Sequence, residues 1–235
     1  MRVVCFDLDD TLCKEIDFLK SAYREIASYA LQRCAEVKES IRMTDVEAYD
    51  TMIEAYYAGK NAFEALNAYL GLNIPVAELL QKYREHIPQI SLDDDARYTL
   101  NMLKSDGVVL GIISDGRELT QWNKIRALGL LEWISESCII INSAPECFKP
   151  SPSGFERLEA IARELSKDDK ISFTYVGDNL NKDFIYPKKR GWNTVCLKDD
   201  GRNIHKQNFE ITPVEALPDV LCDSLGKILN IEVNR

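Results

Sequence analysis

The feature that most constrains the fold is a short apolar run near the N-terminus that ends in closely spaced acidic residues. Residues 2–6 form the run, and Asp7, Asp9 and Thr11 follow it at alternate positions. Because side chains alternate between faces at the end of a strand, Asp7 and Asp9 are expected to point the same way. Two converging carboxylates repel each other unless a cation or a proton transfer uses them, which favours a magnesium-dependent site with one attacking and one proton-moving acid. A polar turn in which Asp10 or Thr11 caps a helix would explain the same residues.

Length and charge limit the classes of protein to which the chain can belong. At 235 residues, 46% of them hydrophobic, it can bury a full core and carry a second small module. A formal net charge of −9 argues against nonspecific binding to nucleic acid or to an anionic membrane. No apolar stretch approaches the roughly 20 residues of a membrane span, and the N-terminus is typical of a strand rather than of a signal peptide. Seven scattered cysteines without a CxxC pair favour reduced thiols in a cytoplasmic protein.

Residues 15–91 show helical periodicity and no hairpin signal. Apolar residues recur at three- and four-residue spacing, and Thr44 with Glu47 has the pattern of a capping box. Four helices are predicted, at 16–36, from Thr44 onward, at 61–70 and at 76–86. We therefore predict that residues 15–91 form an inserted, all-helical domain.

From residue 92 onward the pattern alternates between helix and strand. Helices are predicted at 96–105, 119–128, 153–165 and 182–190, and strands at 108–113, 138–141, 171–176 and 194–197. For the tail, residues 209–230, we predict one weak strand and a last helix after Pro218. This alternation predicts an α/β fold with a doubly wound, Rossmann-like parallel sheet, formed by residues 1–14 and 92–235. Ligands of such a sheet bind at the carboxyl ends of its strands.

The predicted strand ends carry different reactive groups. They are Asp7 and Asp9 after the first strand, Ser114 with Asp115 and Gly116 after the next, Lys149 before the helix near Ser153, and Asp178 and Asp183 after the strand at 171–176. Each has an ordinary explanation alone, as a helix cap, a solvated lysine or a helix N-terminal charge. Together they combine a nucleophile, a hydroxyl, a cation and metal-binding acids, and these ordinary explanations do not account for that ordered combination.

The same residues carry a resemblance to a known family. The motifs Asp7-x-Asp9-x-Thr11, Ser114, Lys149 and Gly177-Asp178-x-x-x-x-Asp183 occur in the order of the four motifs of the haloacid dehalogenase superfamily. The chain is similar to its phosphatase branch, also in the run Gln121, Lys124 and Leu128-Gly129-Leu130. The resemblance covers about residues 1–14 and 92–200, and the helical insert lies where that family places its type 1 cap domain.

The resemblance implies a chemical role for each residue of the first motif. Asp7 would attack phosphorus and form an aspartyl-phosphate. Asp9 would protonate the leaving oxygen and then deprotonate the attacking water. Thr11 would hold Asp9 and the turn.

It also implies how phosphate and metal would be bound. Ser114, the backbone amides of Asp115 and Gly116, and Lys149 would bind the phosphoryl group. The Mg²⁺ cofactor would be held by Asp7, Asp178 and the backbone carbonyl of Asp9, and Asp183 would bind it directly or orient Lys149.

Departures from the family pattern narrow the expected activity. Dehalogenases of the family lack the acid found here as Asp9, and phosphonate-cleaving members replace it with alanine. Phosphohexomutases keep both acids and stay an alternative, although they usually have a glycine where Asp10 stands. A non-catalytic phosphate-binding relative is a further alternative, and a phospho-acceptor domain would be about half this length. We expect a monomeric or homodimeric phosphomonoesterase for a small phosphorylated metabolite such as a sugar phosphate, a nucleotide or a phosphoglycolate-like acid.

Overall fold

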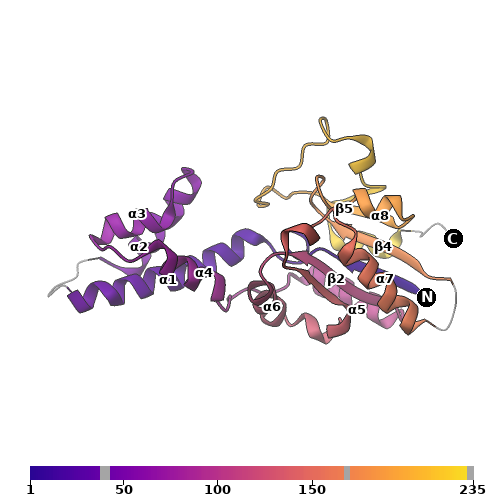
Figure 1. Cartoon of the computed structure of the whole chain (residues 1–235), viewed down its shortest axis with the longest axis horizontal. Helices are drawn as coiled ribbons and strands as arrows, with labels where there is room; N and C mark the ends of the chain where they lie inside the picture. The colour runs from indigo at the N-terminus through magenta and orange to yellow at the C-terminus, as the bar shows by residue number, and fades with distance from the viewer. Residues whose placement is uncertain (38–42, 167–169, 232–235) are drawn as a thin grey trace. The chain divides into compact units, whose positions relative to one another are not determined.

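The chain divides into two compact units in the computed structural model, which describes residues 1–37, 43–166 and 170–231 (Figure 1). Met1–Ile16 and Ser91–Arg235 form one unit, called here the core unit. Asp17–Ile90 form the other, the helical unit. Among the described helices we find none whose length and hydropathy would suit a transmembrane segment.

The core unit contains a six-stranded parallel sheet, which confirms the predicted doubly wound α/β fold. Its strands are β1 (Arg2–Phe6), β2 (Val109–Asp115), β3 (Ile139–Asn142), β4 (Ser172–Gly177), β5 (Asn193–Leu197) and β6 (Val220–Cys222). They lie in the order β3-β2-β1-β4-β5-β6. The central strands are apolar along nearly their whole length because helices cover both faces of the sheet.

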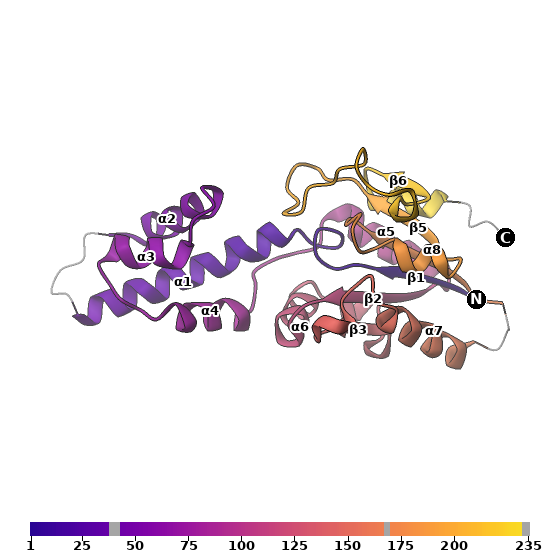
Figure 2. The ribbon, with the colours of Figure 1, turned by 45° about the horizontal axis from the view of Figure 1, so that its top comes forward.

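Four helices cover the sheet, and their faces follow from the right-handed crossovers of parallel strands. They are α5 (Asp94–Ser105), α6 (Glu118–Ala127), α7 (Ser153–Leu165) and α8 (Ile185–Lys189). Helices α5 and α6 lie on one face and α7 and α8 on the other (Figures 1 and 2). On the second face the ring of Phe155 in α7 packs against Tyr175 of β4, with 5.2 Å between centroids, and against Tyr186 of α8, with 5.3 Å.

The strand order reverses between β1 and β4, and this places two acidic strand ends side by side. Phe6, the last residue of β1, pairs with Val176 of β4. The backbone N–H of Asp7 then donates to the carbonyl of Val176 at 2.8 Å. Asp178 follows directly after β4. Doubly wound sheets bind their ligands at such a reversal point, at the carboxyl ends of the strands.

The helical unit contains α2 (Asp45–Tyr57), α3 (Ala62–Leu70), α4 (Val76–Glu85) and most of α1 (Glu15–Val37). The predicted capping box is present, because the Glu47 N–H donates to Thr44 Oγ1 at 3.2 Å and the Thr44 N–H donates to the Glu47 carboxylate at 2.9 Å. Aromatic rings join the helices: the ring of Tyr83 in α4 lies 5.3 Å from that of Phe18 in α1 and 6.5 Å from that of Phe63 in α3.

A cluster of the buried residues Ser21 and His86 with the exposed Glu25 fastens the segment after α4 to α1. Ser21 Oγ lies 2.7 Å from His86 Nε2, and the other ring nitrogen of His86 contacts the Glu25 carboxylate. The order of groups resembles a catalytic triad, but Ser21 is only 5% exposed and its oxygen accepts the Gln89 N–H at 2.8 Å. A hydroxyl enclosed in this way has no approach for a substrate, so we interpret the cluster as structural.

Two predicted elements differ from the structure. The helix predicted at 182–190 begins only at Ile185, because the Asp183 carboxylate accepts the N–H groups of Asp178 and Asn179, at 3.1 and 2.8 Å, and holds a turn there. After Pro218 the chain first forms strand β6, and the predicted last helix is a short 3₁₀ helix at Leu225–Asn230. The open edge of β5 supplies pairing groups that outweigh the weak local preference of this segment.

Candidate functional site

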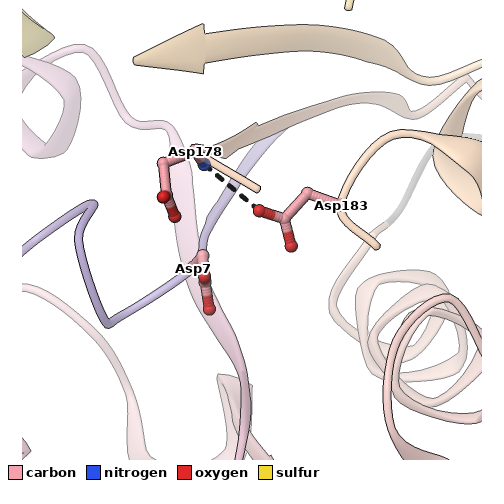
Figure 3. Close-up of side chains that lie close together, drawn as sticks. All are labelled: Asp7, Asp178 and Asp183. Carbon is pink, nitrogen blue, oxygen red and sulfur yellow. Dashed lines mark hydrogen bonds between the residues drawn. The ribbon is translucent and has the colours of Figure 1, made fainter. Parts of the chain in front are cut away.

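Three carboxylate groups lie together where β1 and β4 end (Figure 3). Asp7, Asp178 and Asp183 are 2%, 3% and 0% exposed, and their oxygens can be chosen so that all lie within 4.8 Å of one another. Asp7 comes from the loop after β1, and the other two come from the turn after β4. Buried carboxylates at this spacing repel one another strongly unless positive charge accompanies them.

The side chain of Lys149 supplies part of that positive charge. It is fully buried, and its Nζ lies 2.8 Å from Asp7 Oδ1 and 2.8 Å from Asp183 Oδ1. It also donates to the Tyr175 hydroxyl at 2.8 Å. Burial alone would lower the pKa of Lys149, but Asp183 and Asp7 raise it well above its usual value, so the ammonium stays charged. Lys149 thus joins two of the three acids.

One buried ammonium does not neutralise three carboxylates. Burial would raise the pKa of Asp7, but Lys149 lowers it below its ordinary value, so Asp7 is ionised. The pKa of Asp178 is raised to about 9, first by burial and then by Asp183 and Asp7. Further positive charge at this point would restore the ionised form of Asp178. Since carboxylate oxygens are the preferred ligands of hard divalent cations, the three acids fit such a cation.

Asp9 lies outside this three-acid cluster and faces α6 instead. Its Oδ1 is 2.6 Å from Lys124 Nζ, and its Oδ2 accepts from Gln121 Nε2 at 2.9 Å. The same amide nitrogen lies 2.7 Å from Ser114 Oγ. Gln121 therefore connects Asp9 to the predicted phosphate-binding hydroxyl, and Lys124 places a charged donor beside the predicted proton-transfer group.

The region around Ser114 lies at the end of β2, where this strand pairs with β3. Ser114 is 1% exposed and lies within β2, and its oxygen accepts from Gln121 while its own O–H can still donate. The N–H of Gly116, expected to bind a phosphoryl oxygen, donates to the Asn142 carbonyl at 3.0 Å. Pairing with β3 thus continues to this point and engages that N–H in the structure. The Asp115 carboxylate accepts the backbone N–H of Lys149 at 3.1 Å and so positions that residue.

Thr11 and Lys182 also lie at the edge of the cluster. The Thr11 hydroxyl contacts Asp178 Oδ1 at 3.4 Å, and the resemblance implies that Thr11 helps to hold Asp9 and the turn. Its backbone N–H donates to Leu8 O at 3.4 Å, within the expected turn. Lys182 Nζ is 3.5 Å from Asp115 Oδ2. Burial would lower the pKa of Lys182, but Asp7 raises it, so a second cation stands beside the acids. Sequence spacing did not single out Lys182, since a lysine in a polar turn is common.

The fold and the cluster together define a class: doubly wound α/β proteins with buried acids and a lysine at the reversal point of the sheet. Comparison with known families agrees with the predicted resemblance. Residues 1–185 of the 235 match the family model described as haloacid dehalogenase-like hydrolase. The chain belongs to this family of hydrolases.

Relatives with curated names match nearly the whole chain. Glyceraldehyde 3-phosphate phosphatase of Methanopyrus kandleri is 25% identical over 239 residues, covering 98% of this chain and 97% of that protein. The protein of the same name from Pyrococcus furiosus is 27% identical over 209 residues, covering 84% of this chain and 81% of the relative.

Solved structures with the same fold include an HAD phosphatase from Thermococcus onnurineus, with a TM-score of 0.55 and 20% identity. They also include a putative β-phosphoglucomutase from Thermotoga maritima, with a TM-score of 0.59 and 18% identity. Both alignments cover 98% of this chain and 97% of the other. At these identities the two structures support the fold alone.

Proposed function

We propose that this protein is a Mg²⁺-dependent phosphomonoester hydrolase that acts on a small phosphorylated metabolite through an aspartyl-phosphate on Asp7. The observation that carries the proposal is the contact of Lys149 with both Asp7 and Asp183, at 2.8 Å each, inside a cluster of three buried acids. It keeps a nucleophile ionised beside a permanent positive charge at the reversal point of the sheet.

In the first proposed step, an ionised Asp7 oxygen attacks phosphorus and the bond from phosphorus to the ester oxygen breaks. The departing oxygen needs a proton, and Asp9 is the acid placed to supply it. Lys124 and Gln121 contact both carboxylate oxygens of Asp9, which fixes the direction in which that group points. The products of this step are the free alcohol and a phosphoryl group on Asp7.

In the second proposed step, water attacks the same phosphorus and the bond to the Asp7 oxygen breaks. Asp9, now ionised, accepts the proton of the attacking water. Inorganic phosphate leaves, and both Asp7 and the protonated Asp9 are restored. Dividing the hydrolysis into two displacements lets one carboxyl group act first as acid and then as base.

Binding of the transferring group would use the positive and hydrogen-bonding side chains around the acids. Lys149 and the Ser114 hydroxyl are the proposed phosphoryl ligands, with the backbone amide of Asp115. Lys182, which contacts Asp115, would add a second positive charge beside the phosphoryl group. Asp7, Asp178 and the backbone carbonyl of Asp9 would hold Mg²⁺, with Asp183 as a ligand or as the partner of Lys149. When bound, the cation neutralises charge on the phosphoryl group.

The leaving group should be selected by the helical insert, residues 15–91, which we propose acts as a cap domain. A closing helical domain admits small substrates better than protein substrates. The curated relatives are named for glyceraldehyde 3-phosphate, so short phosphorylated sugars are the first substrates to test. Nucleoside monophosphates and phosphorylated hydroxy acids belong to the same test.

The proposal is tested by measuring phosphate release from a panel of phosphorylated metabolites, with Mg²⁺ and with a chelator. Asp7→Asn should abolish release, and the control Asp223→Asn, which alters an exposed acid paired with Lys227, should leave it unchanged. Isomerisation of sugar phosphates without release would identify a mutase instead. Absence of both reactions over the whole panel would leave a non-catalytic phosphate-binding protein and overturn the proposal.

A further inference from the structure

The segment that follows β5 folds against the proposed metal site, although it lies beyond the residues that the family model matches. We propose that Asn203 in this segment is a positioning residue: it holds the Asp178 carboxylate in the orientation that binds the divalent cation. The inference rests on the metal site of the proposed function. It adds a residue that none of the four motifs contains.

Asn203 is enclosed between two charged partners. It is 2% exposed, its Nδ2 donates to Asp178 Oδ2 at 3.0 Å, and its Oδ1 accepts from Lys14 Nζ at 2.6 Å. Lysine can only donate, so the amide oxygen must face Lys14. The amide N–H₂ group is therefore forced toward Asp178. The orientation of the side chain follows from chemistry and does not depend on how oxygen and nitrogen were assigned.

The backbone around Asn203 is anchored on both sides of the site. The Ile204 N–H donates to Asp10 Oδ2 at 2.9 Å, which ties the segment to the loop after β1. Gln207 Nε2 donates to the carbonyl of Asp178 at 2.7 Å and to that of Leu197 at 2.8 Å. Asn203 thus stands on backbone that is attached both to the loop carrying Asp9 and to Asp178 itself.

The two oxygens of Asp178 are contacted unequally. Asn203 occupies Oδ2, whereas the Thr11 hydroxyl is a long 3.4 Å from Oδ1. An amide donor fixes the rotamer of the Asp178 carboxyl group and adds no charge of its own, so the group can still bind a cation through its other oxygen. Removing the donor lets the carboxylate rotate, and the binding of metal must then order it. Loss of such a partner of a metal ligand typically weakens metal binding by about 10- to 100-fold.

The test is calorimetric titration of the metal-free protein with MgCl₂ in the absence of substrate, so that its readout does not depend on turnover. Asn203→Ala should weaken Mg²⁺ binding about 10- to 100-fold relative to wild type. Asn208→Ala, an exposed asparagine five positions further along the same segment, is the matched control and should bind as wild type does. Thermal unfolding in a chelator accompanies each titration, because a purely structural role would lower the unfolding temperature and leave the Kd unchanged.

Lys14→Met supplies a second route to the same answer, should Asn203→Ala fail to fold. Without the ammonium the side-chain amide of Asn203 can flip, so that its N–H₂ group no longer has to face Asp178. Mg²⁺ binding should then weaken several-fold although Asn203 is still present. A Kd equal to that of wild type in the folded Asn203→Ala protein, or in Lys14→Met if only that variant folds, would overturn the inference and leave the proposed function intact. A wild-type protein that binds no Mg²⁺ would overturn the proposed metal site, and the role of Asn203 with it.

Discussion

Replacing Lys149 by methionine tests the electrostatic account of the acid cluster. The substitution keeps a long apolar stem but removes an ammonium that lies 2.8 Å from both Asp7 and Asp183 and donates to the Tyr175 hydroxyl. Two buried carboxylates then face each other without the ammonium that contacts both of them. Removing one partner of a buried ion pair typically costs about 3–5 kcal/mol of unfolding free energy. In a domain of this size, Tm falls by about 2–4 °C for each kcal/mol of unfolding free energy that is lost. The expected fall in Tm is therefore roughly 6–20 °C.

The assay is thermal unfolding at neutral pH in the presence of a chelator. Lys206→Met is the matched control, because its 3.0 Å contact with Asp199 is made by a side chain that is 64% exposed. An exposed pair of this kind contributes about 0–1 kcal/mol. Adding Asp183→Asn to Lys149→Met should recover part of the loss, since one of the two repelling charges disappears. A Lys149→Met protein that melts within about 2 °C of wild type would refute the reasoning.

Three further predictions concern the proton-transfer group, a buried carboxylate and the helical unit. Lys124→Met should lower kcat about 10- to 100-fold for alkyl phosphates, whereas the burst of p-nitrophenol from p-nitrophenyl phosphate, whose leaving group needs no proton, should keep its rate; equal losses in the two rates would contradict a role in orienting Asp9. Burial would raise the pKa of Glu159, but hydrogen bonds from Arg190 and then Trp192 lower it below 4.5, so Glu159→Gln should reduce Tm at neutral pH. This deficit should shrink as the pH falls through that lowered pKa, because wild type then loses the same contribution; a deficit independent of pH in calorimetric scans would contradict it. His86→Ala should cost about 2–4 kcal/mol in chemical denaturation, since it leaves a buried hydroxyl with one partner fewer; a cost below about 0.5 kcal/mol would show that the cluster does not hold the helical unit.

The parts of the site that the sequence predicts are those attached to regular elements. Asp7 and Asp178 follow apolar runs that form neighbouring parallel strands, so their proximity follows from strand order alone. The Lys149 contacts were expected from the resemblance, since no periodicity links residue 149 to residue 7. The capping box at Thr44 was visible because its two residues are local to each other.

The parts that the sequence does not predict depend on contacts between irregular segments far apart in the chain. Asn203 lies 25 positions from Asp178 and 189 from Lys14, in a polar stretch without periodicity. The N–H of Gly116 was assigned to phosphate because a turn was expected there, whereas pairing with β3 extends far enough to use it. The partner of this N–H depends on where the pairing of β2 with β3 ends, and the ends of elements are the features that a sequence pattern predicts least well.

The central claim is that Asp7 carries the phosphoryl group and that Asp9 completes its release. Rapid mixing of Asp9→Asn with p-nitrophenyl phosphate and Mg²⁺ tests both at once, because this ester leaves without a proton while hydrolysis of the intermediate still needs a base. We expect a burst of one equivalent of p-nitrophenol, slow turnover after it, and a phosphoryl group located on Asp7 by mass spectrometry of the acid-quenched protein. Steady release of phosphate with no burst and no phosphorylated Asp7, together with activity that survives Asp7→Asn, would contradict the account.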